Sequence, residues 1–285
     1  MAILPALPGV EVRVVVGGEP AREWPMPYDP EALWNSEHPE VPRTINYIES
    51  MSGSRFSVTA SLYSGHGISD PAPAHANQAF PEGTDMVAFR VTIDGVFFHS
   101  FGIYINETDT KVFGDRYFRM PNGNIRKQFP VFSNIITTEE ASRAAIEADT
   151  ARIRTLGKID IVVSAIQVTG EMPNIAYPND SAASPDMEVA MKVHNLYAQH
   201  LTHATQYEEE PQDGTPGLKT YNKLATLGEF QFQYSSHRPV VGRNGFTLAE
   251  PMPAVESTNL LPQHHYPEEE MADGTPMVDL TGNDE

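Results

Sequence analysis

Hydrophobic and polar residues alternate along several short segments of the chain, which is the pattern of β-strands that bury one face. In residues 55–63 one face carries Phe56, Val58, Ala60 and Leu62. The opposite face of that segment carries serines and a threonine. Comparable segments predict strands at residues 10–16, 44–49, 85–93, 96–105, 111–113, 116–120, 125–132, 158–168 and 228–236.

Turn residues separate several of these segments. Asp94 and Gly95 stand between two β-rich runs, and both central positions of a type I′ hairpin turn need positive φ, which Asp and Gly tolerate. Asn122 and Gly123 give a second turn signal, between residues 116–120 and 125–132. Residues 52–54 predict a turn that makes a strand pair of residues 44–49 and 55–63.

Two segments have helical patterns. Residues 138–156 carry acidic residues early, basic residues late and Gly157 as a stop signal, with Thr137 or Thr138 as the expected cap. Residues 186–197 place several apolar side chains roughly on one side, which predicts a second helix.

Many short strands with one or two helices favour an α+β fold that is mainly antiparallel β. We expect a β-sandwich with helical insertions over residues 8–238. Residues 251–285 contain eight acidic residues, five prolines and no Lys or Arg. Few apolar groups there offset the entropy cost of ordering, so residues 239–285 are expected to form a disordered acidic tail.

Composition narrows the function classes. Asp plus Glu number 38 against 19 Lys plus Arg, a formal net charge of −19, which disfavours binding to nucleic acid or to an anionic membrane. The chain has no cysteine, which excludes disulfides, thiolate metal sites and cysteine nucleophiles. Residues 1–9 lack the features of a signal peptide, so we expect an intracellular protein. No motif predicts a cofactor, and no Gly-x-Ser-x-Gly elbow predicts a serine hydrolase.

The C-terminal segment Met277-Val-Asp-Leu-Thr-Gly-Asn-Asp-Glu285 has the pattern of a strand that joins the edge of a partner's sheet. Alternating apolar side chains insert into the partner, and the following carboxylates face a basic rim. The segment resembles the SUMO-interacting motif of the Val-Asp-Leu-Thr type. The resemblance implies binding to SUMO or a SUMO-modified protein through Val278, Asp279, Leu280, Thr281, Asp284 and Glu285. A chance match of a short pattern is the alternative.

Histidines offer a different chemistry. His194, His200 and His203 lie within ten residues, and the last two have the i, i+3 spacing with which two imidazoles on a helix can bind zinc. No glutamate stands beside the pair as in a His-Glu-x-x-His motif. A polar or capping role near a helix end is therefore favoured over a metal site.

The order of several segments resembles an uncharacterised fungal domain family. The matching segments are residues 8–12, 46–58, 91–95, 156–162, 203–206 and 228–236. The chain departs from the family where a His-x-Thr segment usually continues as Leu-Gly-Glu, because Tyr207 and two glutamates stand there. The resemblance implies a fungal origin and an intracellular globular domain, and it carries over no catalytic residue.

These observations favour a non-enzymatic interaction protein that binds SUMO through its tail and an unknown protein through its β domain. The tail motif suggests a nuclear location. One alternative is a metal-dependent hydrolase built on His194, His200 and His203. Another is a structural or assembly protein, because β-sandwich domains often build oligomers.

Overall fold

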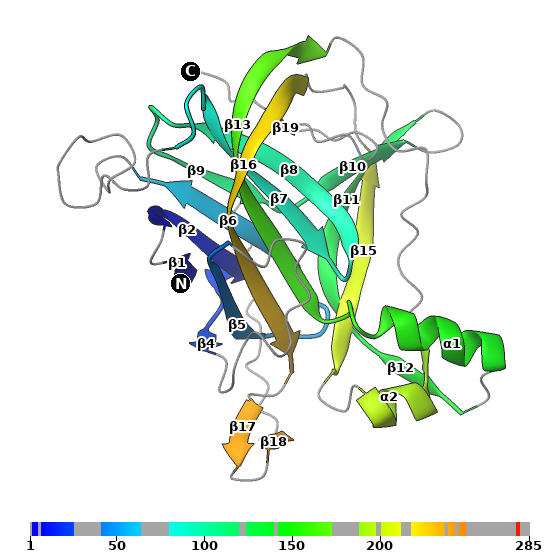
Figure 1. The fold of residues 1–285 in the computed structure, drawn as a ribbon. Coiled ribbons are helices and arrows are strands. Elements are labelled where there is room, and N and C mark those ends of the chain that lie inside the picture. The colour runs from blue at the N-terminus through cyan, green and yellow to red at the C-terminus, as the bar shows by residue number, and fades with distance from the viewer. Residues whose placement is uncertain are drawn as a thin grey trace.

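The computed structural model describes most of the β-rich part of the chain (Figure 1). The described residues are 2–4, 7–25, 41–63, 80–119, 124–139, 142–172, 188–197, 201–211, 218–236, 239–242, 245–248 and 278–279. Within them the chain forms nineteen strands and two helices. The prediction of a mainly antiparallel β fold with one or two helices is confirmed at this level.

An antiparallel sheet forms near the N-terminus. Its strands follow the order β1 (Ala2–Leu4), β2 (Leu7–Val16), β6 (Phe56–Leu62) and β9 (Asp109–Phe113). The short β3 (Glu19–Pro20) also pairs with β2. Alternate residues of β2 and β6 point into the core, as the sequence pattern predicts.

The largest sheet contains seven strands. Their order is β13 (Lys158–Met172), β7 (Met86–Ile93), β8 (Val96–Tyr104), β19 (Val278–Asp279), β16 (Leu218–Ser235), β5 (Arg43–Glu49) and β4 (Glu23–Pro25). Because β13 also pairs with β16, the strands β13, β7, β8, β19 and β16 form a closed circuit of pairings. The sheet is mixed, since β5 runs parallel to β16 and β19 runs parallel to β8.

Three smaller sheets complete the described chain. One has the order β10 (Arg116–Arg119), β11 (Ile125–Asn134) and β15 (His203–Pro211). In the second, β12 (Ile136–Thr138) runs parallel to β14 (Glu188–Ala190). The third is the antiparallel pair β17 (Pro239–Gly242) and β18 (Gly245–Leu248).

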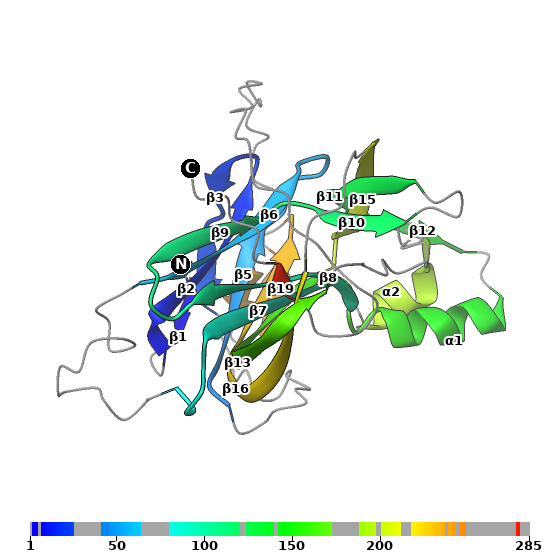
Figure 2. The same cartoon turned by 90° about the horizontal axis from the view of Figure 1, so that it is seen from above.

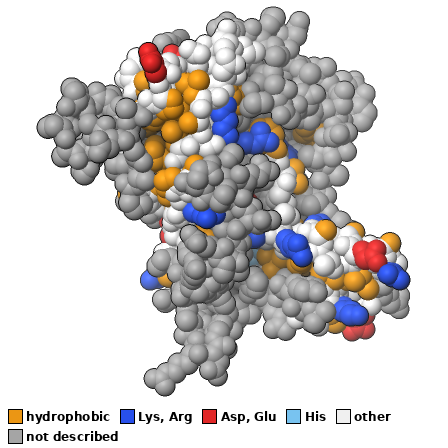
Figure 3. Space-filling view, in the orientation of Figure 1, with side chains coloured by type: hydrophobic (Ala, Val, Ile, Leu, Met, Phe, Trp, Pro, Cys, Tyr) orange, Lys and Arg blue, Asp and Glu red, His pale blue; other side chains and the backbone are white. Residues whose placement is uncertain are grey.

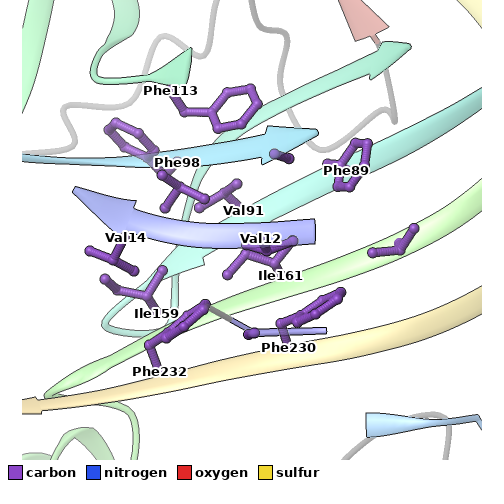
Figure 4. Packing of buried hydrophobic residues seen from close by; sticks show 14 of the residues in the cluster. Val12, Val14, Phe89, Val91, Phe98, Phe113, Ile159, Ile161, Phe230 and Phe232 are labelled. Atoms are coloured by element: carbon purple, nitrogen blue, oxygen red, sulfur yellow. The ribbon is translucent and has the colours of Figure 1, made fainter. Parts of the chain in front are cut away.

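The main core lies between the N-terminal sheet and the large sheet (Figures 1 and 4). Figure 4 shows side chains from β2, β7, β8, β9, β13 and β16 meeting there: Val12, Val14, Phe89, Val91, Phe98, Phe113, Ile159, Ile161, Phe230 and Phe232. Each of these side chains is almost completely buried. Full burial of one such side chain stabilises the fold by about 1.5–3 kcal/mol, so this core supplies the main driving force for folding.

The helices α1 (Arg143–Arg152) and α2 (Met191–Tyr197) lie to one side of the sheets (Figures 1 and 2). None of the residues of α1 is buried. A second, smaller core joins the segment after α1 to β14, α2 and β15, and it contains Ile153, Leu156, Val189, Ala190, Val193, Leu201 and Ala204.

Several sequence predictions need correction. The first helix begins at Arg143, with Ser142 as its cap, because Thr137 and Thr138 pair with β14 as part of a strand. The predicted second helix begins at Met191, after the strand β14. Residues 44–49 and 55–63 are not a pair, since β5 joins the large sheet and β6 the N-terminal sheet, although the turn between them forms.

Two further corrections concern the C-terminal half. The last core strand, predicted at residues 228–236, is longer: β16 begins at Leu218 and pairs along β13. The strand β15 was not predicted at all. Within residues 239–285 the structure describes β17, β18 and β19, and the expected disorder of this tail stays a prediction.

Candidate functional site

The C-terminal motif contributes a described strand, β19, which consists of Val278 and Asp279. This strand runs antiparallel to β16, with Asp279 opposite Leu218 and Val278 opposite Lys219. On its other side β19 runs parallel to β8, with Asp279 opposite Phe101. Figure 2 shows it in red beside β8. The other predicted SUMO-binding residues lie outside the described part of the chain: Leu280, Thr281, Asp284 and Glu285.

Side chains from β8 and β16 meet across the gap that β19 occupies. The Lys219 ammonium donates a hydrogen bond to the Tyr104 hydroxyl at 2.9 Å and lies 5.3 Å from the centre of the same ring. A second link joins the hydroxyls of Tyr221 on β16 and Ser100 on β8. Burial raises the pKa of Tyr221 to about 12, while the charge of Arg90 and the bond to Ser100 act in the opposite direction.

Two of the three histidines of the alternative metal site lie in the described residues, on different elements. His194 of α2 makes a hydrogen bond through Nε2 to the carbonyl oxygen of Leu201 at 2.9 Å, which is a polar role near a helix end. His203 lies at the start of β15, a strand, so it does not share a helix face with its neighbour. His200 lies outside the described residues. No group of three possible metal ligands occurs within the described ranges.

His203 instead joins a hydroxyl cluster that sequence reasoning missed. Its Nδ1 lies 2.9 Å from the Ser50 hydroxyl and 3.1 Å from the Thr202 hydroxyl. Thr202 also contacts the hydroxyls of Ser235 and Ser236. A serine beside an imidazole is the arrangement of an activated nucleophile. Here, however, Ser50 is 2 % and His203 is 3 % exposed, so the pair ties β5, β15 and β16 together instead of facing a substrate.

Asp94 is the most densely hydrogen-bonded side chain in the described structure. It is 6 % exposed and occupies the turn between β7 and β8 with φ of 51°, followed by Gly95 with φ of 77°. The Asp–Gly hairpin predicted from sequence is therefore confirmed. Nothing in the local pattern indicates that the carboxylate is buried and shared among distant segments.

Donors from three other segments meet this carboxylate. Oδ1 accepts hydrogen bonds from the Gly157 amide at 2.7 Å and the Lys158 amide at 3.3 Å. Oδ2 accepts one from the Thr205 amide at 2.7 Å. The Tyr234 hydroxyl lies 2.7 and 2.8 Å from the two oxygens. Burial raises the pKa of Asp94, and these hydrogen bonds counteract that rise. The buried carboxylate is a structural anchor that ties the β7–β8 turn to three other segments.

A second buried polar group surrounds Arg116 of β10. Its guanidinium donates to the Gln128 side chain at 2.9 Å and to the Phe97 carbonyl at 3.1 Å, and it lies 4.0 Å from the centre of the Tyr207 ring. Nearby, His99 donates from Nδ1 to the Asp115 carbonyl at 3.0 Å. Burial, followed by the charge of Lys127, lowers the pKa of His99 to about 3. This histidine is therefore neutral across the physiological range.

Basic and apolar side chains share the face that carries β13, β16 and β8 (Figure 3). Lys and Arg side chains lie in the upper middle of that view, next to an apolar area. No helix in the described parts of the chain has the length and apolar character needed to span a bilayer.

The chain matches a known protein family over most of its length. Residues 9–239 match the model of one family, whose description is domain of unknown function (DUF7918). The chain belongs to the DUF7918 family. No curated protein and no solved structure matches it significantly. Asp94, Tyr234 and the hydroxyl cluster all lie within the DUF7918 match, and β19 lies beyond it.

Proposed function

We propose that this DUF7918 protein is a non-enzymatic interaction protein whose C-terminal segment binds SUMO or a SUMO-modified protein. The binding residues are Val278, Asp279, Leu280, Thr281, Asp284 and Glu285. The observation that carries the proposal is the strand β19: Val278 and Asp279 pair with β16, and Asp279 also pairs with β8, within the chain itself. A segment that pairs in this way has the backbone conformation that addition to a partner's sheet requires.

The chemistry of the segment fits such a partner. In an extended strand, Val278 and Leu280 fall on one face and supply the apolar contacts, while backbone hydrogen bonds supply the register. Asp284 and Glu285 follow, and carboxylates there complement a basic rim and increase the association rate. An interface formed by so few residues is small, so the contact is weak and exchangeable.

For residues 8–238 we infer a β-sandwich-like domain that contacts a separate protein partner. The shared core of the N-terminal sheet and the large sheet supports the sandwich arrangement. The enclosed positions of Ser50, His203 and Asp94 support a structural role for these three polar groups. We further propose that the protein acts inside the cell, in the nucleus, where SUMO-modified partners would be met.

The test is a titration of the full chain with SUMO. We expect Val278→Ala combined with Leu280→Ala to weaken binding about 10-fold or more, because truncating two buried aliphatic side chains removes a few kcal/mol of apolar contact. The matched control, Leu260→Ala with Leu261→Ala, removes two apolar side chains from the same acidic region and leaves the affinity unchanged. Unchanged binding by the motif variant would refute the proposal.

A further inference from the structure

The two strands beside β19 leave room for one added strand between them. Asp279 lies opposite Phe101 of β8 on one side and opposite Leu218 of β16 on the other. Neighbouring strands are about 4.8 Å apart, so two strands that both flank a third lie about 10 Å apart. At the position of β19, therefore, β8 and β16 do not pair with each other and present their backbone groups to an inserted segment.

Side chains hold this gap at a fixed width. The Lys219–Tyr104 hydrogen bond connects β16 to β8, and the Tyr221–Ser100 bond connects the same two strands. The other edges of β16 and β8 are also paired, because β16 pairs with β13, β13 with β7, and β7 with β8. The acceptor is preorganised, and an incoming strand does not have to order it.

Charge favours the occupant that the structure contains. Residues 251–285 carry eight acidic side chains and no Lys or Arg. Lys219, which is directly opposite Val278, places a cation at the gap. A cation near an acidic segment favours its association and disfavours its release.

We infer that the gap between β8 and β16 is a strand-acceptor site that binds the chain's own C-terminal segment and thereby withholds it from SUMO. The inference rests on the proposed function and adds its regulation. A two-residue strand cannot pair with β8 and β16 and with a SUMO edge at the same time. The apparent affinity for SUMO is then reduced by the fraction of molecules in which the segment is free.

The acceptor site is tested first, without SUMO, by amide hydrogen exchange on the full chain. Proline lacks the amide hydrogen and disrupts strand pairing, so Val278→Pro is expected to increase exchange at least about threefold in residues 99–103 and 218–221. Ala272→Pro introduces the same residue outside the motif and leaves these segments protected. If Val278→Pro leaves their exchange unchanged, the acceptor site is refuted, whatever the affinity for SUMO.

Competition is tested by SUMO titration of variants whose motif is intact. Lys219→Glu removes the link to Tyr104 and repels the acidic segment, so it should bind SUMO about threefold to tenfold more tightly than the wild type. Lys192→Glu makes the same charge change on the exposed side of α2 and should bind like the wild type. Tyr104→Phe keeps the ring, removes only the hydroxyl link, and should act in the same direction with a smaller effect.

The outcomes separate the two proposals. Wild-type affinity in both Lys219→Glu and Tyr104→Phe would refute competition even if exchange shows that β19 pairs. Absence of SUMO binding in every variant would refute the proposed function, and hydrogen exchange would still decide whether the acceptor site exists.

Discussion

The turn at Asp94 and the strand β19 are both short segments attached to the body of the protein, and they are attached in opposite ways. Asp94 accepts hydrogen bonds from Gly157, Lys158, Thr205 and Tyr234, all within a region closed to solvent. The strand β19 contributes two residues, attached through backbone pairing at the edges of β8 and β16.

The difference shows how the number and kind of hydrogen bonds separate permanent from exchangeable contacts. Removing a partner from a buried hydrogen-bonded charge leaves unsatisfied groups and costs several kcal/mol. A two-residue strand pairing contains few backbone hydrogen bonds, so losing it costs about 1 kcal/mol. We therefore expect the first contact to determine stability and the second to regulate binding.

The largest expected effect is at Asp94. Asparagine tolerates the positive φ of this turn. Its side-chain NH2, however, replaces an oxygen that accepts hydrogen bonds, so a donor would face the donors of the surrounding segments. Asp94→Asn should lower the free energy of unfolding by about 3–5 kcal/mol, measured by urea denaturation. Asp85→Asn is the matched control near the other end of the same strand, where the carboxylate accepts an exposed bond from Val168, and it should cost less than about 1 kcal/mol. Equal losses of unfolding free energy in the two variants would contradict the role of Asp94 as a structural anchor.

The neighbouring Gly157 offers a steric test of the same region. Its φ is 73°, and a Cβ there would lie 2.2 Å from Cδ1 of Leu201. Gly157→Ala combines overpacking with backbone strain and should destabilise by about 2–4 kcal/mol. Gly53 has a similar φ of 79° and open space around it. Gly53→Ala should therefore show only the backbone strain of a positive φ, which lowers stability by about 1 kcal/mol. The difference between the thermal midpoints of the two variants measures the cost of the clash with Leu201.

The lowered pKa of His99 leads us to expect a loss of stability in mild acid. Its pKa is about 3 in the folded protein and about 6.5 in the unfolded chain, so below pH 6.5 only the unfolded state takes up the proton. Between pH 7 and pH 5 this should cost the wild type about 2 kcal/mol. The raised pKa of Asp94 acts in the opposite direction, which makes a variant comparison necessary. His99→Phe should lose about 2 kcal/mol less over that interval, measured by urea denaturation at both pH values; an unchanged difference would argue against a buried neutral histidine.

The smallest stability effect is expected when the C-terminal segment is removed. A chain shortened after residue 274 lacks β19 but keeps every contact of the main core. Its free energy of unfolding should fall by less than about 1 kcal/mol, while amide exchange at Lys219 and its neighbours increases. A loss of several kcal/mol would mean that β19 is an integral part of the sheet.

Local patterns predicted the local structure well. The alternation in residues 55–63 and the Asp94–Gly95 turn both appear as expected, because each depends on neighbours in sequence. The helix at 138–156 was overextended because Thr137 and Thr138 find a strand partner fifty residues later, at β14. Tertiary pairing here overrides local propensity.

Some of the missed elements have partners that are remote in sequence, as β15 has in β11. The outer part of β15 carries Glu208, Glu209 and Glu210, which resembles a solvated loop until Arg55 pairs with two of them at 2.6 and 3.0 Å. In the same way, nothing local distinguishes Asp94 from an ordinary turn aspartate. Its role depends on Thr205 and Tyr234, more than one hundred residues away.

The candidate site was predictable only in part. The proposed tail motif rests on its own short pattern, because strand addition depends on consecutive residues. Its pairing with β8 and β16 was not predictable, since the acceptor gap is created by four strands from separate parts of the chain.

The most direct test of the central claim is an NMR titration of the isotope-labelled full chain with unlabelled SUMO. We predict shifts in residues 276–285, which bind, together with shifts at Phe101, Leu218 and Lys219, from which β19 departs. No shifts at a high concentration of SUMO, or shifts elsewhere in the β domain with the C-terminal segment unchanged, would contradict the account.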